Sequence, residues 1–173
     1  MMKPQIYRIK DIGPGLLSVM AKPVAGEWLD EDFRFYKDSG ISLIVSLLED
    51  MEAFELGLQG EKEIAERHGI AFLSFPVADR GLPESFFGFK AFVSSLHHQI
   101  KGGAHAAVHC RAGIGRSGLT AAAVLLHEGF TPEDAFALIS EVRRCPVPDT
   151  DEQRRWLIEN RRDLFEREKI SKF

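Results

Sequence analysis

The sequence predicts an α/β fold with a central, mostly parallel sheet of about four to five strands flanked by helices. Three observations support this prediction. Strand-like apolar runs alternate with helical segments, which is the pattern of α/β units. Residues 41–48 form a β-branched and leucine run, typical of a strand buried on both faces and therefore of a parallel sheet. A loop of the form Cys-x5-Arg also lies between an apolar strand and an alanine-rich helix.

The length of 173 residues fits a single domain, residues 1–173, with a core that needs no disulfides. Two cysteines are too few for a disulfide framework, and Cys145 is predicted to be an inert thiol rather than a redox partner of Cys110. The net charge of −4 gives no footprint for a nucleic-acid partner, and no segment is apolar enough for a membrane span or a signal peptide. We therefore expect a cytoplasmic protein, and favour a monomer.

In the first half of the chain, short apolar runs bounded by Gly and Pro predict strands, and apolar residues at helical spacing predict helices. A Gly-Pro-Gly turn at residues 13–15 separates the first two strands, and Gly40 ends the first helix. The predicted strands cover residues 6–9, 16–20, 41–48 and 70–77, and the predicted helices cover residues 27–38 and 60–68.

In the second half, a long amphipathic helix ends at Lys-Gly-Gly before the strand that leads into the Cys-x5-Arg loop. The penultimate helix has a strong start signal, because Thr131 supplies a capping hydroxyl, Pro132 fits the first helical position and two acidic residues follow. The predicted strand covers residues 105–109, and the predicted helices cover residues 84–100, 116–128, 131–144 and 149–169.

Residues 107–118 read Ala-Val-His-Cys-Arg-Ala-Gly-Ile-Gly-Arg-Ser-Gly and form the most informative motif of the chain. The loop is short enough for its backbone N–H groups to turn inward around an anion, and the following helix directs its positive end to the same point. These donors and Arg116 also stabilise a thiolate, so Cys110 is predicted to be an ionised nucleophile near neutral pH. Arg116 is predicted to hold two phosphate oxygens through its planar fork.

The order His-Cys, five residues, Arg, then Ser-Gly resembles the signature loop of the cysteine-based protein tyrosine and dual-specificity phosphatases, and the similar order of elements covers roughly residues 40–160. The resemblance implies a small dual-specificity-like catalytic domain that hydrolyses phosphorylated protein through a phosphocysteine intermediate, with no cofactor and no metal ion. It also implies that His109 orders the loop from behind; a satisfied core histidine is the alternative.

Other residues of the loop are predicted to bind substrate or assist catalysis. Ser117 lies where its hydroxyl can donate to the Cys110 sulfur and help the thiolate leave, or where it caps the helix, and both roles are compatible. The glycines permit the tight backbone path. The predicted substrate-binding residues are Arg111, Ala112, Gly113, Ile114, Gly115 and Arg116.

The leaving oxygen of a phosphate monoester needs a proton, and Asp79 is the predicted general acid. It follows the strand predicted at residues 70–77, and dual-specificity phosphatases similarly carry their acid on a loop after the strand that precedes the long helix. A simple turn residue before Gly81 is the alternative for Asp79. Glu84 is a second candidate, although a first-turn helix position also explains it. Arg80 is either a rim contact for an anionic substrate or a solvated surface side chain.

The segment around Gln153 resembles the place where tyrosine phosphatases often hold a glutamine that positions the hydrolytic water. Gln153, followed by Trp156 and Leu157, matches that arrangement, whereas Asp149 stands where the first glutamine of the region is usual. The water-positioning role is therefore assigned to Gln153 or Asp149. An ordinary first-turn helix residue is the alternative for Gln153.

The function best supported by the sequence is a protein phosphatase acting on phosphotyrosine. A shallow pocket, expected from the short chain and the lack of a recognisable phosphotyrosine-recognition loop, also admits phosphoserine and phosphothreonine. Two alternatives stay open: a phosphatase for phosphoinositides or other non-protein phosphate monoesters, and a pseudophosphatase that only binds phosphoproteins. Arsenate reduction and rhodanese-type sulfur transfer fit less well. Arsenate reduction in the low-molecular-weight phosphatase style resembles an architecture with the loop near the N-terminus and the acid after it, which is the reverse of the order here. Rhodanese-type enzymes lack the Arg-Ser-Gly and the acid loop.

Overall fold

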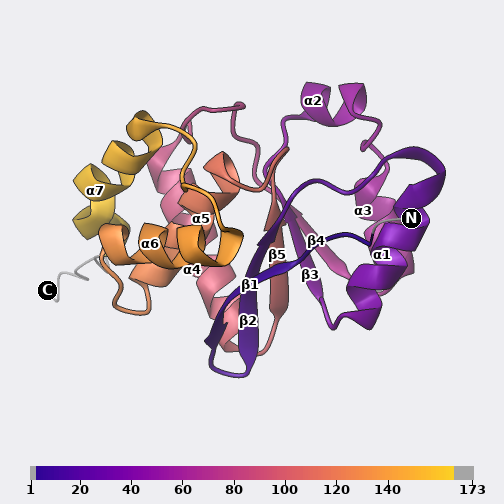
Figure 1. Ribbon diagram of the computed structural model, residues 1–173, viewed down its shortest axis with the longest axis horizontal. Helices are drawn as coiled ribbons and strands as arrows, with labels where there is room; N and C mark the ends of the chain where they lie inside the picture. Colours follow the sequence, from indigo (N-terminus) through magenta and orange to yellow (C-terminus); the bar gives the residue numbers. More distant parts are fainter. Residues whose placement is uncertain (1–2, 166–173) are drawn as a thin grey trace, which may run out of the picture.

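The computed structural model describes residues 3–165, in which a five-stranded sheet lies between two groups of helices (Figure 1). The strand order is β1-β2-β5-β3-β4; β1 pairs antiparallel with β2, and the other three pairings are parallel. The predicted mostly parallel α/β sheet is confirmed. The strands are β1 (Tyr7–Ile12), β2 (Gly15–Met20), β3 (Leu43–Ser46), β4 (Ala71–Ser74) and β5 (His105–His109).

Helices α1 and α3 cover one face of the sheet and α4 to α7 cover the other (Figure 1). No helix within residues 3–165 has the length and apolar character needed to cross a bilayer. The helical segments are η1 (Gly26–Trp28), α1 (Leu29–Asp38), α2 (Asp50–Glu55), α3 (Glu61–Arg67), α4 (Phe86–Lys101), α5 (Gly115–Leu126), α6 (Pro132–Arg143) and α7 (Asp151–Phe165).

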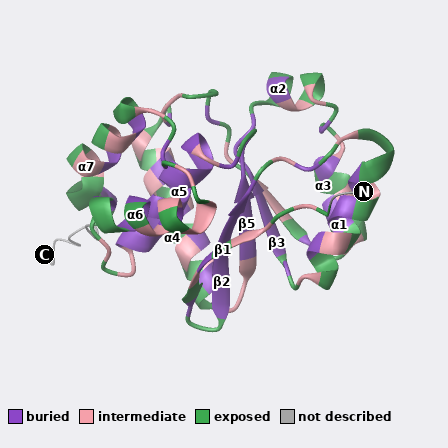
Figure 2. Ribbon diagram, in the orientation of Figure 1, coloured by how far each residue is buried: buried purple, intermediate pink, exposed green. Residues whose placement is uncertain are grey.

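Two apolar cores lie on opposite faces of the sheet, because successive strand side chains point to opposite sides. In β3, Leu43 and Val45 belong to the core beneath α4 and α5, while Ile44 belongs to the core beneath α1. Every residue of α5 is buried, as Figure 2 shows by its colour, and its alanines let it approach the sheet closely. The central strand β5 and helix α5 therefore hold the connecting loop rigidly.

Several predicted boundaries shift. The run at residues 41–48 is buried, but its strand spans only Leu43–Ser46, and the run at residues 70–77 is a strand only over Ala71–Ser74. After β4 the chain leaves regular pairing, although the Val77 N–H still donates to the Leu47 carbonyl at 3.0 Å. This departure carries the segment after β4 across the carboxyl end of the sheet.

One helix prediction needs correction, and one helix was missed. The helix predicted at residues 84–100 begins at Phe86, with Ser85 accepting from the Gly88 N–H as its cap, so the first-turn position expected for Glu84 is wrong. Helix α2 was not predicted, because a six-residue segment is too short to show helical periodicity. The start signal at Thr131 is confirmed, and residues 166–169 of the last predicted helix lie outside the described residues.

Candidate active site

Residues 110–116, here called the phosphate loop, join β5 to α5 at the carboxyl ends of the parallel strands. Three successive carbonyls of this loop are held from outside. The Lys22 N–H donates to the Arg111 carbonyl at 3.2 Å, while Arg143 donates to the carbonyls of Ala112 and Gly113 at 2.9 and 3.0 Å. The Gly113 and Ser117 N–H groups donate toward Cys110, so the loop has donors on its inner side of the kind that an anion requires.

Arg143 is a clamp on the outside of the phosphate loop. Its guanidinium lies 4.0 Å from the centroid of the Tyr7 ring, so the ring of β1 supports the fork that holds the two loop carbonyls. Gly113 makes this path possible, since its φ is +72° and a Cβ there would lie 2.4 Å from the Met20 carbonyl oxygen.

Cys110 lies at the floor of the phosphate loop and is only 3% exposed. Burial raises the pKa of its thiol, but hydrogen bonds from the Ser117 hydroxyl and N–H, the charge of Arg116 and the Gly113 N–H together hold that pKa below its ordinary value. Within residues 3–165 the buried Ser117 hydroxyl has no oxygen or nitrogen partner, so its proton is available to the sulfur.

Arg116 is almost fully buried, and its guanidinium is fixed by three other residues. Both Glu52 oxygens accept from it, at 2.8 and 3.1 Å, the Val77 carbonyl accepts at 2.8 Å, and Asp79 accepts from Nη2 at 3.1 Å. The bidentate pair with Glu52 orients the fork, because two parallel N–H···O bonds fix the plane of the guanidinium.

Glu52 also pairs with Arg111, whose Nη2 lies 3.3 Å from the carboxylate. Burial raises the pKa of Glu52, but the hydrogen bond from Arg116 and the charges of Arg116 and Arg111 hold it below its ordinary range. Glu52 therefore stays ionised and offsets part of the positive charge of the loop. The predicted substrate contact Arg111 is half exposed at the rim.

Residues 78–82, here called the acid loop, form a tight turn in which the Gly81 N–H donates to the Ala78 carbonyl at 2.8 Å. Arg80 has a φ of 57° in this turn, a left-handed conformation that is uncommon for a side-chain-bearing residue. Asp79 is 52% exposed and contacts Arg116. The chain thus places Asp79 beside the phosphate loop while leaving its carboxylate accessible.

His109 lies behind the loop and is fully buried. Its Nε2 faces Glu61 of α3 at 2.5 Å, and its Nδ1 faces the Cys110 carbonyl at 3.1 Å. Burial lowers the pKa of His109, but the charge and hydrogen bond of Glu61 outweigh it and hold that pKa above its ordinary value. Because both ring nitrogens face acceptors, the doubly protonated imidazolium satisfies both contacts.

Gln153 and Asp149, between which the water-positioning role was divided, both contact the acid loop. Gln153 is completely buried and donates to the Gly81 carbonyl at 3.1 Å, while Asp149 accepts from Arg80 at 3.2 Å. Of the residues that follow, Leu157 is buried in the core, and Trp156 packs edge-on to Phe89. Cys145 is a partly buried free thiol.

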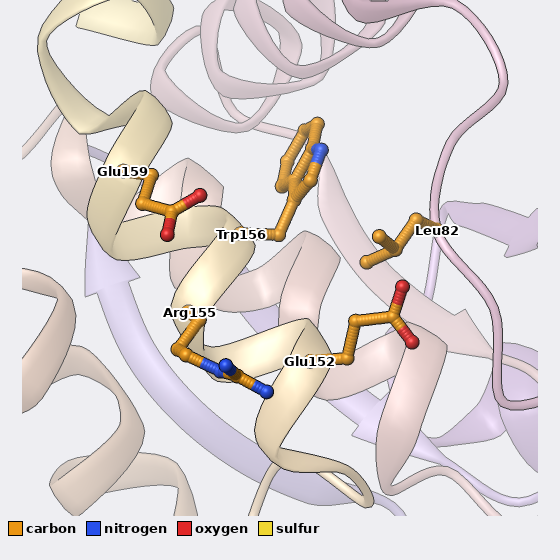
Figure 3. Close-up of a pocket in the computed structure, with 5 residues that line it drawn as sticks. All are labelled: Leu82, Glu152, Arg155, Trp156 and Glu159. Atoms are coloured by element: carbon orange, nitrogen blue, oxygen red, sulfur yellow. The ribbon is translucent and has the colours of Figure 1, made fainter.

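A groove of about 380 Å³ flanks the acid loop on its outer side (Figure 3). Its lining comes from the acid loop and from one face of α7, namely Leu82, Glu152, Arg155, Trp156 and Glu159. Within residues 3–165 no cluster of three or more His, Cys, Asp or Glu side chains has the arrangement of a metal site.

The structure brings together Cys110, Arg116, Ser117 and Asp79, which the sequence singled out. Sequence reasoning missed Glu52, Arg143 and Glu61. Glu52 is one of 26 acidic residues and lies in a helix without visible periodicity, so no local signal marks it.

Comparisons with known proteins agree with this geometry. Residues 18–130 match the family model described as Tc-R-P: Polymorphic toxin system, DSP-PTPase phosphatase. The chain is also 35% identical over 69 residues to the "Putative tyrosine phosphatase 197R" of Invertebrate iridescent virus 6; this covers 38% of the chain and 26% of the viral protein, about a quarter of its length.

Solved phosphatase structures share the fold over nearly the whole chain. Kinase associated phosphatase (KAP), with its catalytic cysteine replaced by serine, superposes with a TM-score of 0.85 at 22% identity, covering 95% of this chain and 97% of KAP. Tk-PTP in its active form gives 0.71 at 24% identity, covering 90% and 97%, and PTPMT1 in complex with PI(5)P gives 0.72 at 22%, covering 92% and 96%. Since the family model spans more than half of the chain, the protein belongs to the DSP-PTPase phosphatases of the Tc-R-P family and is a cysteine-based phosphatase.

Proposed function

We propose that this phosphatase acts on phosphotyrosine in proteins, and more slowly on phosphoserine and phosphothreonine, through a phosphocysteine intermediate. The observation that carries the proposal is the buried Cys110 thiol, whose pKa is lowered by the Ser117 and Gly113 donors and by Arg116, together with Asp79 in contact with that same Arg116. Only a nucleophile ionised near neutral pH, next to an accessible acid, supports both halves of this reaction.

In the first step the Cys110 sulfur attacks phosphorus. The P–S bond forms as the bond from phosphorus to the leaving oxygen breaks, and protonated Asp79 gives its proton to that oxygen. In the second step water attacks phosphorus, Asp79 accepts a proton from the water, and the P–S bond breaks. The Ser117 hydroxyl donates to the departing thiolate and stabilises it.

Arg116 links the two loops during this cycle. Its Nη1 donates to Glu52 and Val77, and its Nη2 donates to Glu52 and to the half-exposed Asp79. An incoming phosphate oxygen takes the Nη2 hydrogen that Asp79 accepts. Asp79 is thereby released from the ion pair at the moment when its proton is needed.

The charge of the loop supports a monophosphorylated substrate. Gly113, Ile114 and Gly115 leave the wall neutral, and Glu52 pairs with both Arg111 and Arg116. Adjacent phosphates would therefore meet little unpaired positive charge. Phosphoinositides are the second candidate class, because a protein of the same fold, PTPMT1, is known in complex with PI(5)P.

The chemistry is tested with an aryl phosphate in the presence of EDTA. We expect full activity with the chelator, and a loss of at least about 10⁴-fold in Cys110→Ser together with retained vanadate binding. Activity that requires metal and persists in Cys110→Ser would contradict the mechanism.

The substrate is tested by comparing kcat/KM for a phosphotyrosine peptide, the matching phosphoserine and phosphothreonine peptides, and soluble phosphoinositides. The phosphotyrosine peptide should be turned over best, because its longer stem lets phosphorus reach Cys110. A clear preference for a polyphosphorylated inositol would overturn the substrate while leaving the cysteine mechanism intact.

A further inference from the structure

We propose that Gln153 is a positioning residue that holds the acid loop, and therefore Asp79, against the phosphate loop. The inference rests on the proposed function, in which Asp79 is the general acid. It gives this glutamine a role in placing the general acid, instead of the water-positioning role expected from sequence.

Both polar atoms of the Gln153 amide are already engaged. Its Oε1 accepts from the Thr150 N–H at 3.2 Å, and the Thr150 hydroxyl accepts from the Gln153 N–H at 3.1 Å, which forms a reciprocal cap at the start of α7. Its Nε2 donates to the Gly81 carbonyl at 3.1 Å. The amide is therefore oriented by α7 and directed at the acid loop.

The same amide rests on the phosphate loop. A Cβ at Gly115 would lie 3.2 Å from the Gln153 Oε1 and 3.3 Å from its Nε2, and 2.9 Å from the Asp149 Cβ. Gly115 is thus the surface on which the amide packs. One fully buried side chain spans the distance between the first residue of α5 and the carbonyl of Gly81.

The acid loop needs such support. Arg80 holds a left-handed conformation, and residues in sparsely populated backbone regions persist only when their surroundings fix them. Besides its internal Gly81–Ala78 bond and the Asp79–Arg116 ion pair, the turn is tied to the start of α7 by two further contacts, Arg80–Asp149 and Gln153–Gly81. The first pair is exposed and contributes little, whereas the second is buried and is expected to dominate.

The outer side of the acid loop is held by the packing of Leu82 against the core, with no polar contact equivalent to that of Gln153 among residues 3–165. There Leu82 lines the groove of Figure 3 together with Glu152 and Trp156 of α7, and within residues 3–165 no hydrogen bond joins these side chains to the acid loop. Support from α7 therefore comes through the inward-facing Gln153. Without its amide donor, the turn is expected to sample positions in which Asp79 is too far from the leaving oxygen.

Two variants isolate this contact. Gln153→Glu keeps the size of the side chain and the acceptor for Thr150 but loses the donor to Gly81. Gln153→Met keeps the size but has neither the acceptor nor the donor. Glu152→Gln, at the neighbouring exposed position on the same helix, is the matched control. Each protein is assayed with phenyl phosphate and with p-nitrophenyl phosphate, whose leaving group scarcely needs an acid, and vanadate binding checks the phosphate loop.

We expect both Gln153 variants to lose about tenfold in kcat/KM for phenyl phosphate but less than about threefold for p-nitrophenyl phosphate, with vanadate binding retained and Glu152→Gln unchanged. In an Asp79→Asn background, the Gln153 substitutions should cause no further loss. A residue that acts through Asp79 has no effect once the acid is gone.

Other outcomes overturn the inference. Equal losses on both substrates, or a loss of vanadate binding, would make Gln153 a support of the phosphate loop. A lower kcat with unchanged kcat/KM and a burst of p-nitrophenol would restore the water-positioning role, since kcat/KM does not report the hydrolysis of the intermediate. If the loss of activity in Asp79→Asn does not depend on the leaving group, Asp79 is not the acid, and the proposed function fails at that residue. If Asp79→Asn shows the expected dependence while the Gln153 variants keep full activity on both substrates, this inference alone is overturned.

Discussion

In the proposed reaction the phosphate loop supplies the nucleophile and the acid loop supplies the general acid, yet the two loops are built differently. The phosphate loop lies between a central strand and a fully buried helix, and its outward carbonyls are held by Lys22 and Arg143. The acid loop leaves regular strand pairing and carries the half-exposed Asp79 on a turn with a left-handed Arg80. The first is fixed by the core; the second is held by a few polar contacts and by Leu82, which packs against the core.

This difference matches what each loop must do. An anion cradle gains from rigidity, because donors fixed in advance need no reorganisation when charge develops. In the proposed cycle Asp79 must leave its ion pair with Arg116 and reach the leaving oxygen, so its support has to hold the loop without burying the carboxylate. The following predictions test that division, from the largest expected effect to the smallest.

Removing the acid should separate the chemistry of the two loops. Asp79→Asn is expected to slow hydrolysis of phenyl phosphate by about 10²–10⁴-fold, with a smaller loss for p-nitrophenyl phosphate. The fall of kcat/KM on the basic side of its pH profile should also disappear, because asparagine cannot ionise. If the variant and the parent share one pH profile, another residue supplies the proton.

The buried pair behind the phosphate loop should set a pH-dependent part of stability. Since Glu61 holds the pKa of His109 above its ordinary value, the stabilisation is complete below about pH 6.5, the ordinary histidine value, and is lost as pH rises through the higher folded-state value. Glu61→Gln should therefore lower the free energy of unfolding by about 3–5 kcal/mol at pH 6, and by less in alkaline solution. Chemical denaturation at both pH values measures the difference, and a cost that is independent of pH would argue against a charged His109.

Loosening the clamp on the phosphate loop should weaken anion binding without touching the acid loop. Arg143→Met loses two hydrogen bonds to loop carbonyls and is expected to lower stability by about 1–2 kcal/mol and to weaken vanadate binding. The ratio of rates for phenyl and p-nitrophenyl phosphate should stay unchanged. Arg144→Met, at the next position, is the control, and equal effects of both substitutions would show that the clamp is unimportant.

The exposed link between Arg80 and Asp149 should matter least. Both side chains reach solvent, so Asp149→Asn is expected to change the free energy of unfolding by no more than about 0.5 kcal/mol and kcat/KM by less than about twofold. Thermal denaturation and the phenyl phosphate assay measure these changes. A loss comparable to that of the Gln153 variants would mean that the surface pair, rather than the buried amide, holds the acid loop.

The sequence by itself determined the parts of this protein that depend on neighbouring residues. The strand at residues 105–109 was predicted with its observed bounds, and the phosphate loop follows from a short run of consecutive residues in which Gly113 allows the turn. The start of α6 follows from Thr131 and Pro132. Apolar periodicity, turn residues and capping act over a few residues, so these features are visible without a fold.

Only the tertiary structure decided which distant charges complete the site. Glu52 meets Arg116 across 64 residues of sequence, Glu61 meets His109 across 48, and Gln153 meets Gly81 across 72. Nothing in the local sequence distinguishes these side chains from other polar residues. The sheet order brings β3, β5 and the segment after β4 to one edge, and burial there leaves each charge or amide dependent on the partner that the fold supplies.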